Sequence, residues 1–205
     1  MTGLLRLSGG RRLRSPLGSS TRPTTARVRE AVMNMLAPRL QGASWLDLCS
    51  GSGVMGCEAI ERGVGRVLAV EKDPKTASIC RFNLELIAGG VSPTPSFEVI
   101  RQDVVSWLKG GRPEGLHPFQ MAYLDPPYGS ELYEPALQAL LEGNWIASQG
   151  LVFCEYTHKR NLTPSKQWSV VDQRRYGSTG LLLLSPPKHY LVDTDSTLQQ
   201  TDPSA

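Results

Sequence analysis

The sequence lacks any hydrophobic run long enough to cross a membrane, since its longest purely aliphatic stretch covers only residues 181–184. It also has only four cysteines, and no two of them are at C-x-x-C spacing. This scarcity argues against a disulfide framework or a zinc site, and predicts a protein with no bound metal in a reducing compartment. A cytoplasmic protein is therefore expected, rather than one that is anchored in a membrane.

Acidic residues are scarce at the N-terminus. Residues 1–30 contain seven arginines against the single carboxylate of Glu30, although the whole chain carries a net charge of only +3. A basic arm on a slightly acidic body predicts a polyanionic partner such as RNA. An organelle transit peptide and a plain solvated tail are the alternatives that this composition leaves open. The segment 191–205 is acidic, lacks basic residues and is expected to be a disordered tail.

Short apolar runs alternate with segments of helical periodicity from residue 44 onward. A first helix is expected to begin at Thr24 or Thr25 and to be stopped by Pro38. The alternation predicts an α/β fold with a doubly wound, mostly parallel seven-stranded sheet, and with ligands bound at the carboxyl ends of the strands. We expect a basic N-terminal arm and helix at 1–40, a main domain at 41–190 and the tail at 191–205. The expected strands are 45–48, 66–71, 97–100, 119–124, 150–156, 168–171 and 180–184, and the later helices are 54–62, 74–88, a short one after Asp103, and 131–142.

The first candidate site is the run Asp-Leu-Cys-Ser-Gly-Ser-Gly at residues 47–53, which follows an expected strand. Its small residues allow a ligand to approach the backbone, and the next helix offers free N–H groups. Glu71 lies 20 positions after Gly51, where an acid can bind a ribose. Because residues 51–56 also match G-x-G-x-x-G, an NAD-linked oxidoreductase is an alternative.

Asp47 favours S-adenosylmethionine over a dinucleotide. Its carboxylate would attract the ammonium group of the methionine part and repel a pyrophosphate. Asp103, after the third expected strand, is a candidate for the adenine amine and equally for a helix N-cap. The pattern therefore points to a Rossmann-like sheet of the class I S-adenosylmethionine-dependent methyltransferase type. The candidate cofactor residues are Asp47, Ser50, Gly51, Ser52, Gly53, Glu71, Lys72, Asp73, Asp103 and Val104.

The most specific motif is Asp125-Pro126-Pro127-Tyr128, directly after the fourth expected strand. The prolines restrict the backbone and carry no N–H, so that an amine can donate to the Asp125 carboxylate and to the Pro126 carbonyl. Tyr128 offers a flat face for an extruded base. These four residues are the candidate catalytic group. Adenine in DNA or a protein glutamine are alternative amines, and a silent RNA-binding module is a further alternative.

The N-terminal run at residues 7–13, the segment Arg-Pro-Thr-Thr-Ala-Arg-Val-Arg-Glu at 22–30 and Asn34 resemble the signature of the bacterial RsmD family. Together with the later motifs, the resemblance covers about residues 6–185. It implies methyl transfer from S-adenosylmethionine to the N2 amine of a guanine in 16S rRNA, within an assembling or assembled small ribosomal subunit. It also places the basic arm in the mature enzyme, and a monomer is expected.

The resemblance and the charge of the arm together suggest a set of arginines that contact RNA phosphates. Met33 stands where the family commonly has Phe, and Cys49-Ser50 where it commonly has Phe-Ala. We interpret these departures as packing changes that bear on cofactor affinity and leave the reaction unaltered. The candidate RNA contacts are Arg11, Arg12, Arg22, Arg27 and Arg29.

Overall fold

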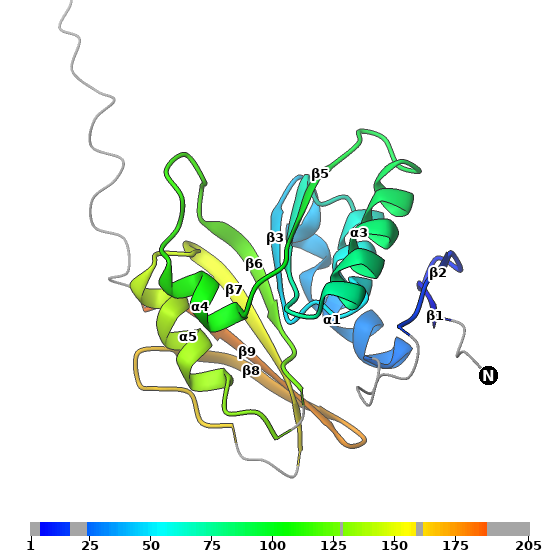
Figure 1. The fold of residues 1–205 in the computed structure, drawn as a ribbon. Helices are drawn as coiled ribbons and strands as arrows, with labels where there is room; N and C mark the ends of the chain where they lie inside the picture. Colours follow the sequence, from blue (N-terminus) through cyan, green and yellow to red (C-terminus); the bar gives the residue numbers. More distant parts are fainter. Residues whose placement is uncertain (1–4, 17–23, 128, 159–161, 188–205) are drawn as a thin grey trace, which may run out of the picture.

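The computed structural model describes residues 5–16, 24–127, 129–158 and 162–187 (Figure 1). Three of the predictions above fall on other positions. Tyr128, Arg22 and the segment 191–205 lie outside the described residues.

The described chain forms a seven-stranded sheet in the order β5-β4-β3-β6-β7-β9-β8 (Figure 1). Strands β3 to β7 are parallel to one another, and β9 runs antiparallel between β7 and β8. The predicted doubly wound, mostly parallel seven-stranded sheet is therefore confirmed. The strands are β3 Ser44–Leu48, β4 Arg66–Val70, β5 Ser96–Ile100, β6 Phe119–Leu124, β7 Ile146–Thr157, β8 Ser169–Tyr176 and β9 Thr179–Ser185.

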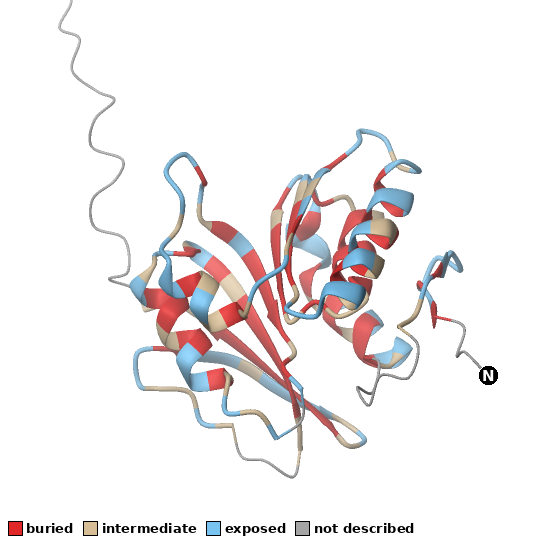
Figure 2. Ribbon diagram, in the orientation of Figure 1, coloured by how far each residue is buried: buried red, intermediate tan, exposed pale blue. Residues whose placement is uncertain are grey.

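Helices cover both faces of this sheet. On one face, α1 (Ala26–Leu40), α2 (Val54–Glu61) and α3 (Pro74–Ala88) enclose an apolar core with the side chains that β3, β4 and β6 direct to that side. On the other, α4 (Val104–Lys109) and α5 (Tyr133–Glu142) enclose a second core. The central strands are accordingly buried on both sides (Figure 2), which explains why they appear in the sequence as continuous apolar runs and not as alternating ones.

The first helix continues past Pro38 to Leu40, so the expectation that this proline stops it is wrong. A proline inside a helix leaves the carbonyl four residues earlier, here that of Asn34, without its N–H partner. Asn34 and Pro38 both lie on the exposed side of α1, where water can solvate that carbonyl. Leu40 is buried and anchors the last turn. Thr25, and not Thr24, caps the start by accepting from Val28 N at 3.3 Å.

The beginning of the basic arm is a short hairpin of β1 (Leu5–Arg6) and β2 (Arg12–Leu13). Leu5, Leu7 and Leu13 are buried in the same core as α1. The described part of the arm is therefore folded onto the main domain through a shared apolar core.

Two strands near the C-terminal end are longer than expected. In β7 the pairing with β6 shifts register between Phe119 and Met121, so the strand begins at Ile146 and bulges before Leu151. In β8 most side chains are exposed, because it is the edge strand of the sheet. Its polar stretch after Val171 therefore looks like a loop in the sequence although it pairs with β9 throughout.

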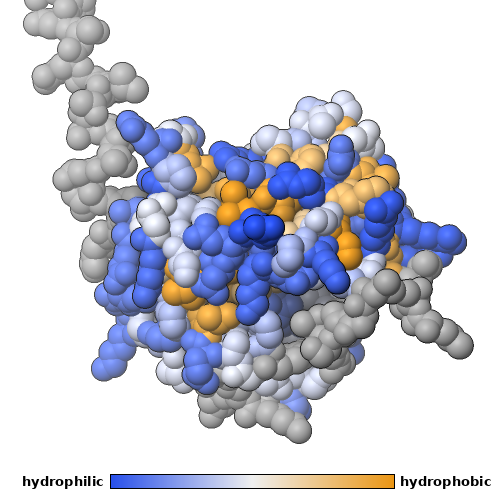
Figure 3. Space-filling model, viewed as in Figure 1, coloured by the Kyte–Doolittle hydropathy of each residue, from blue (hydrophilic) through white to orange (hydrophobic). Residues whose placement is uncertain are grey.

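The face of the molecule seen in Figure 3 is mostly hydrophilic, with apolar residues gathered in patches between the polar ones. None of the helices in the described residues has both the length and the apolar character needed to cross a membrane.

Candidate active site

A cleft of about 380 Å³ lies beyond the carboxyl ends of β3, β4, β5 and β6. This is the edge where a doubly wound sheet binds its ligands, and the volume suits a small-molecule cofactor. Eleven of the predicted site residues line it: Ser50, Gly51, Ser52, Glu71, Lys72, Asp73, Asp103, Val104, Asp125, Pro126 and Pro127. The cleft thus brings eight of the ten predicted cofactor residues and the Asp-Pro-Pro motif into one cavity.

Sequence reasoning missed several lining residues, which are Leu5, Ser15, Pro16, Thr24, Cys49, Val54, Thr76 and Leu132. Four of them belong to the basic arm or to the segment that joins it to α1, for which the sequence suggested RNA contact and a helix start but no contact with the cofactor. No local signal in the sequence marks these positions as cofactor neighbours, because the hairpin reaches the cleft only through its tertiary docking. The arm therefore forms part of the wall of the cleft.

Two glycines in the loop between β3 and α2 adopt backbone conformations that glycine permits at low cost. Gly51 and Gly53 have φ of 54° and 75°, in the left-handed region that favours glycine. A Cβ on Gly53 would also lie 2.7 Å from Cys80 Sγ. These constraints bring the loop backbone close to the cleft and direct it into α2.

Glu71, at the end of β4, holds two loops together. One carboxylate oxygen accepts from Gly51 N at 3.0 Å and the other from Asp73 N at 2.9 Å. A carboxylate has about four acceptor sites, so two remain for ribose hydroxyls. Glu71 therefore both shapes the cleft and retains the capacity predicted for it.

Asp73 and Asp103 are helix N-caps that also line the cleft. Asp73 accepts from Thr76 N at 2.8 Å, and Asp103 accepts from Ser106 N at 3.0 Å. The Thr76 N–H lowers the pKa of Asp73, because a donated hydrogen bond stabilises the carboxylate. Capping and ligand contact are compatible here, since each carboxylate retains free acceptor sites toward the cleft.

Asp47 lies beneath the cleft and is not part of its wall. Its side chain is buried and accepts from Gly56 N at 3.1 Å at the start of α2. Burial raises its pKa to about 7; the Gly56 N–H opposes this rise, and the charge of Glu71 adds to it. The predicted direct contact with a cofactor ammonium is thus not supported, and Asp47 instead supports the loop from below. Gly53 likewise does not line the cleft.

Asp125 follows β6 and is partly buried, with Pro126 buried behind it and Pro127 exposed. Its backbone N–H donates to Leu48 O at 3.3 Å, and its Oδ2 accepts from the Thr24 hydroxyl at 3.2 Å. Burial raises the pKa of Asp125 well above its ordinary value, the charges of Glu155 and Asp47 raise it further, and the Thr24 hydroxyl lowers it. The pKa of Asp125 is therefore raised mainly by burial and is modified by Glu155, Thr24 and Asp47.

The predicted RNA contacts differ strongly in exposure. Arg29 is 4% exposed and forms an ion pair with the fully buried Glu58 at 3.0 Å, so the expectation that it contacts RNA is wrong. Arg11 is exposed, but its guanidinium donates to the carbonyls of Ile87 and Gly90 and forms an ion pair with Glu61. Arg12 and Arg27 are exposed. The buried position of Arg29 follows from its place on the inner face of α1, beside Val28 and Val32.

The sheet topology, the glycine loop and the acidic side chains at the strand ends define a class I S-adenosylmethionine-dependent methyltransferase. The model of the family described as "Conserved hypothetical protein 95" matches residues 6–185, and this chain belongs to that family, the RsmD family.

Known relatives agree with this assignment. The chain is 30% identical to "Ribosomal RNA small subunit methyltransferase D" of Haemophilus influenzae over 168 residues, which cover 82% of this chain and 84% of the relative. It is also 30% identical to the Escherichia coli K12 protein of the same name, over 89% of this chain and 90% of the relative. The solved structure of yhhF from Escherichia coli superposes with a TM-score of 0.75 at 28% identity, covering 90% of this chain and 99% of that one.

Proposed function

We propose that this protein transfers a methyl group from S-adenosylmethionine to the exocyclic N2 amine of a guanine in small-subunit rRNA. The observation that carries the proposal is that the glycine loop, Glu71 and Asp103 share one cleft with Asp125, Pro126 and Pro127. A cofactor site and an amine site must adjoin for a direct methyl transfer. The names of the relatives support rRNA as the substrate.

The residues present fit the cofactor. The cleft is large enough, and apart from Lys72 and the Cys49 thiol its ionisable side chains are carboxylates, which suits a ligand that carries a positive charge. Glu71 would hold the ribose, Asp103 with Val104 the adenine, and Ser50, Gly51 and Ser52 the methionine part. Bound S-adenosylmethionine supplies a methyl group that its sulfonium already activates.

The Asp-Pro-Pro motif would orient the amine. The exocyclic nitrogen of guanine is a poor nucleophile because its lone pair is delocalised into the ring. By accepting the two amine hydrogens, the Asp125 carboxylate and the Pro126 carbonyl would direct that lone pair toward the methyl carbon. Catalysis then comes from positioning and from stabilising the positive charge that develops on the nitrogen. Asp125 does not need to be a strong base, since the nitrogen becomes acidic as the methyl arrives.

The exposed arginines would hold the RNA. Arg12 on β2 and Arg27 on α1 are exposed, and Arg27 lies over the ring of Tyr176 with 5.8 Å from its guanidinium carbon to the ring centroid. Contacts from these two arginines to RNA phosphates would position the substrate without reading its sequence. The proposed partner is rRNA within a small ribosomal subunit.

The test is nucleoside mass spectrometry of small-subunit rRNA from cells with and without the gene. We expect one N2-methylguanosine to disappear and to return with the wild-type gene. Asp125→Ala should bind S-adenosylmethionine normally but lose at least about a hundredfold in turnover. Asp125→Asn is the matched control, because it retains an acceptor of the same shape and should keep intermediate activity.

Each outcome has a distinct meaning. Unchanged rRNA in the deletion strain would refute the substrate and direct the search to another RNA, to DNA or to protein. Full activity of Asp125→Ala would refute the role of the carboxylate, even if the rRNA loses its methyl group in the deletion strain.

A further inference from the structure

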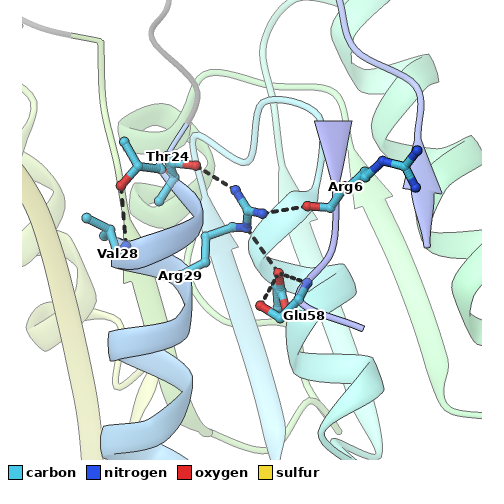
Figure 4. Close-up of polar contacts among 7 residues, drawn as sticks. Arg6, Thr24, Val28, Arg29 and Glu58 are labelled. Carbon is cyan, nitrogen blue, oxygen red and sulfur yellow. Dashed lines mark hydrogen bonds and ion pairs between the residues drawn. The ribbon is translucent and has the colours of Figure 1, made fainter. Parts of the chain in front are cut away.

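Arg29 joins three separate parts of the chain at one buried point (Figure 4). Its guanidinium donates to Glu58 Oε1 on α2 at 3.0 Å, to Thr24 O at 2.8 Å and to Arg6 O on β1 at 2.5 Å. The same Glu58 oxygen accepts from Ser8 N at 3.0 Å and Ser8 Oγ at 3.1 Å. The guanidinium is a planar, rigid fork of donors. It therefore fixes the backbone of Thr24 relative to the hairpin and to the main domain.

We call the Arg29–Glu58 ion pair, with the carbonyls to which Arg29 donates, the clamp. The side chain of Thr24 connects this clamp to the Asp-Pro-Pro motif. Thr24 is 6% exposed, lines the cleft, and donates its hydroxyl to Asp125 Oδ2 at 3.2 Å across a sequence separation of 101 residues. A β-branched side chain has few rotamers available, and here its backbone is held as well. The hydroxyl is consequently a fixed donor to one oxygen of the carboxylate, and the other oxygen is left for the amine.

Apart from Thr24, the described groups that act on Asp125 are acidic or neutral. Glu155 on β7 and Asp47 on β3 both act on it as like charges. Tyr123 on β6 donates its hydroxyl to Glu155 Oε2 at 2.5 Å, and the Cys49 thiol after β3 is also close enough to interact with Asp125. In these surroundings a hydroxyl that donates to the charged carboxylate favours its ionised form. Thr24 thus opposes the effect of burial and of the neighbouring carboxylates.

We propose that Thr24 is a positioning residue for Asp125, held in place by the Arg29–Glu58 ion pair. By this inference the N-terminal arm takes part in the chemical step and does more than bind RNA. It orients the carboxylate that accepts the amine hydrogen and helps to keep that carboxylate ionised. The inference rests on the proposed function, because it concerns the same amine-binding carboxylate.

The experiment compares Thr24→Val with Thr24→Ser on small ribosomal subunits. Valine retains the branched shape and loses the hydroxyl, whereas serine retains the hydroxyl. A hydrogen bond to a charged group is worth enough for kcat of Thr24→Val to fall by about tenfold to a hundredfold. We expect its affinity for S-adenosylmethionine to stay close to wild type, and Thr24→Ser to retain most of the activity. The acid limb of the kcat–pH profile should move to higher pH in Thr24→Val.

Thr25→Val is the matched control. The Thr25 hydroxyl caps α1 and does not line the cleft, so this variant should lower Tm and leave kcat unchanged. An equal loss of kcat in Thr25→Val and Thr24→Val would overturn the proposal, because the effect would then reflect the stability of the helix. Equal impairment of Thr24→Ser and Thr24→Val would overturn it as well, because the hydroxyl would then be irrelevant.

A readout without RNA separates this inference from the proposed function. Carboxyl-carbon NMR of labelled aspartate follows the pKa of Asp125 in the free protein, and we expect a higher pKa in Thr24→Val than in the wild type. The same pKa in both proteins would overturn the positioning role. A wild-type protein that fails to methylate small subunits would overturn only the proposed function, and the NMR comparison would still decide the role of Thr24.

Discussion

The two walls of the cleft are held in different ways. On the cofactor wall several ties are short in sequence, since Asp73 and Asp103 each accept from an N–H three residues later and Glu71 accepts from Gly51 N, 20 residues earlier. Others, between Ser50 and Cys80 and between Asn83 and Ser52, span 30 and 31 residues. On the wall of the proposed amine site, Thr24 meets Asp125 across 101 residues and Arg29 meets Glu58 across 29. The first wall is therefore built into the strand–loop–helix units, whereas the second exists only when the arm is docked.

This difference has a consequence for stability and function. Capping and loop contacts form within each unit, so damage to the arm should leave the cofactor wall largely intact. Damage to the clamp, in contrast, should loosen the side of the cleft on which the proposed amine site lies. Substitutions that act on one wall only test this difference.

The largest effect is expected when the clamp loses its cation. Arg29→Met leaves the buried Glu58 carboxylate without its partner, and the loss of one member of a buried pair typically costs about 3–5 kcal/mol. Arg27→Met, on the exposed side of the same helix, should change stability by less than about 0.5 kcal/mol. Urea denaturation at neutral pH measures the free energy of unfolding of both variants.

A double variant sharpens this result. Arg29→Met with Glu58→Leu replaces the ion pair by apolar side chains, which often restores most of the lost stability. We expect it to be more stable than Arg29→Met alone. Similar free energies of unfolding for Arg29→Met and Arg27→Met would contradict the stabilising role of the clamp. A double variant that is less stable than either single variant would contradict it as well.

A somewhat smaller effect is expected beneath the cofactor wall, where Asp47 has a pKa of about 7 against an ordinary 3.8. The folded state holds this proton more tightly than the unfolded chain, so Asp47 takes up a proton on folding at any pH between these two pKa values. Stability is then lost as the pH rises from about 4 to about 7, by at most about 4 kcal/mol, and levels off above that range. Asp47→Asn removes the charge and should be more stable than the wild type at pH 8, with the difference vanishing near pH 4.

Chemical denaturation at several pH values would check this sign. Asp73→Asn is the control, since the pKa of the exposed Asp73 is lowered and not raised; this variant should show no gain at high pH. If wild type and Asp47→Asn lose stability in parallel between pH 4 and pH 7, the titration does not arise from Asp47.

The cofactor wall was accessible to prediction from the sequence because its signals are local. Gly51 and Gly53 are required by left-handed backbone conformations, and Asp103 both follows a strand and starts a helix. The parallel sheet then brings these strand ends to one edge without further information. A nearly continuous apolar run was sufficient for the strand β6, and a helical pattern that begins at Pro74 was sufficient for the helix at 74–88; the expected bounds of both agree with the structure.

The amine-facing wall was not accessible in the same way. Arg29 and Arg27 are two residues apart in one basic segment, and composition gives them the same interpretation. Only the docking of β1 and α2 against α1 shows that one is an internal cation and the other a surface cation. Thr24 could be recognised as a neighbour of Asp125 only from the fold, because no periodicity connects positions that far apart.

The smallest effect is expected from the exposed arginine of this pair. Each cation that neutralises a phosphate releases counterions, so loss of one contact lowers the steepness of the salt dependence of RNA binding by about one unit of log K per log salt. Arg27→Met should therefore bind small-subunit rRNA more weakly at low salt and with a shallower salt slope. Folded Arg29→Met should keep the wild-type slope, because a buried guanidinium that already donates to three protein acceptors cannot reach a phosphate. If both variants lower the slope equally, Arg29 must leave its clamp when RNA binds, and the two walls would then be coupled through the substrate.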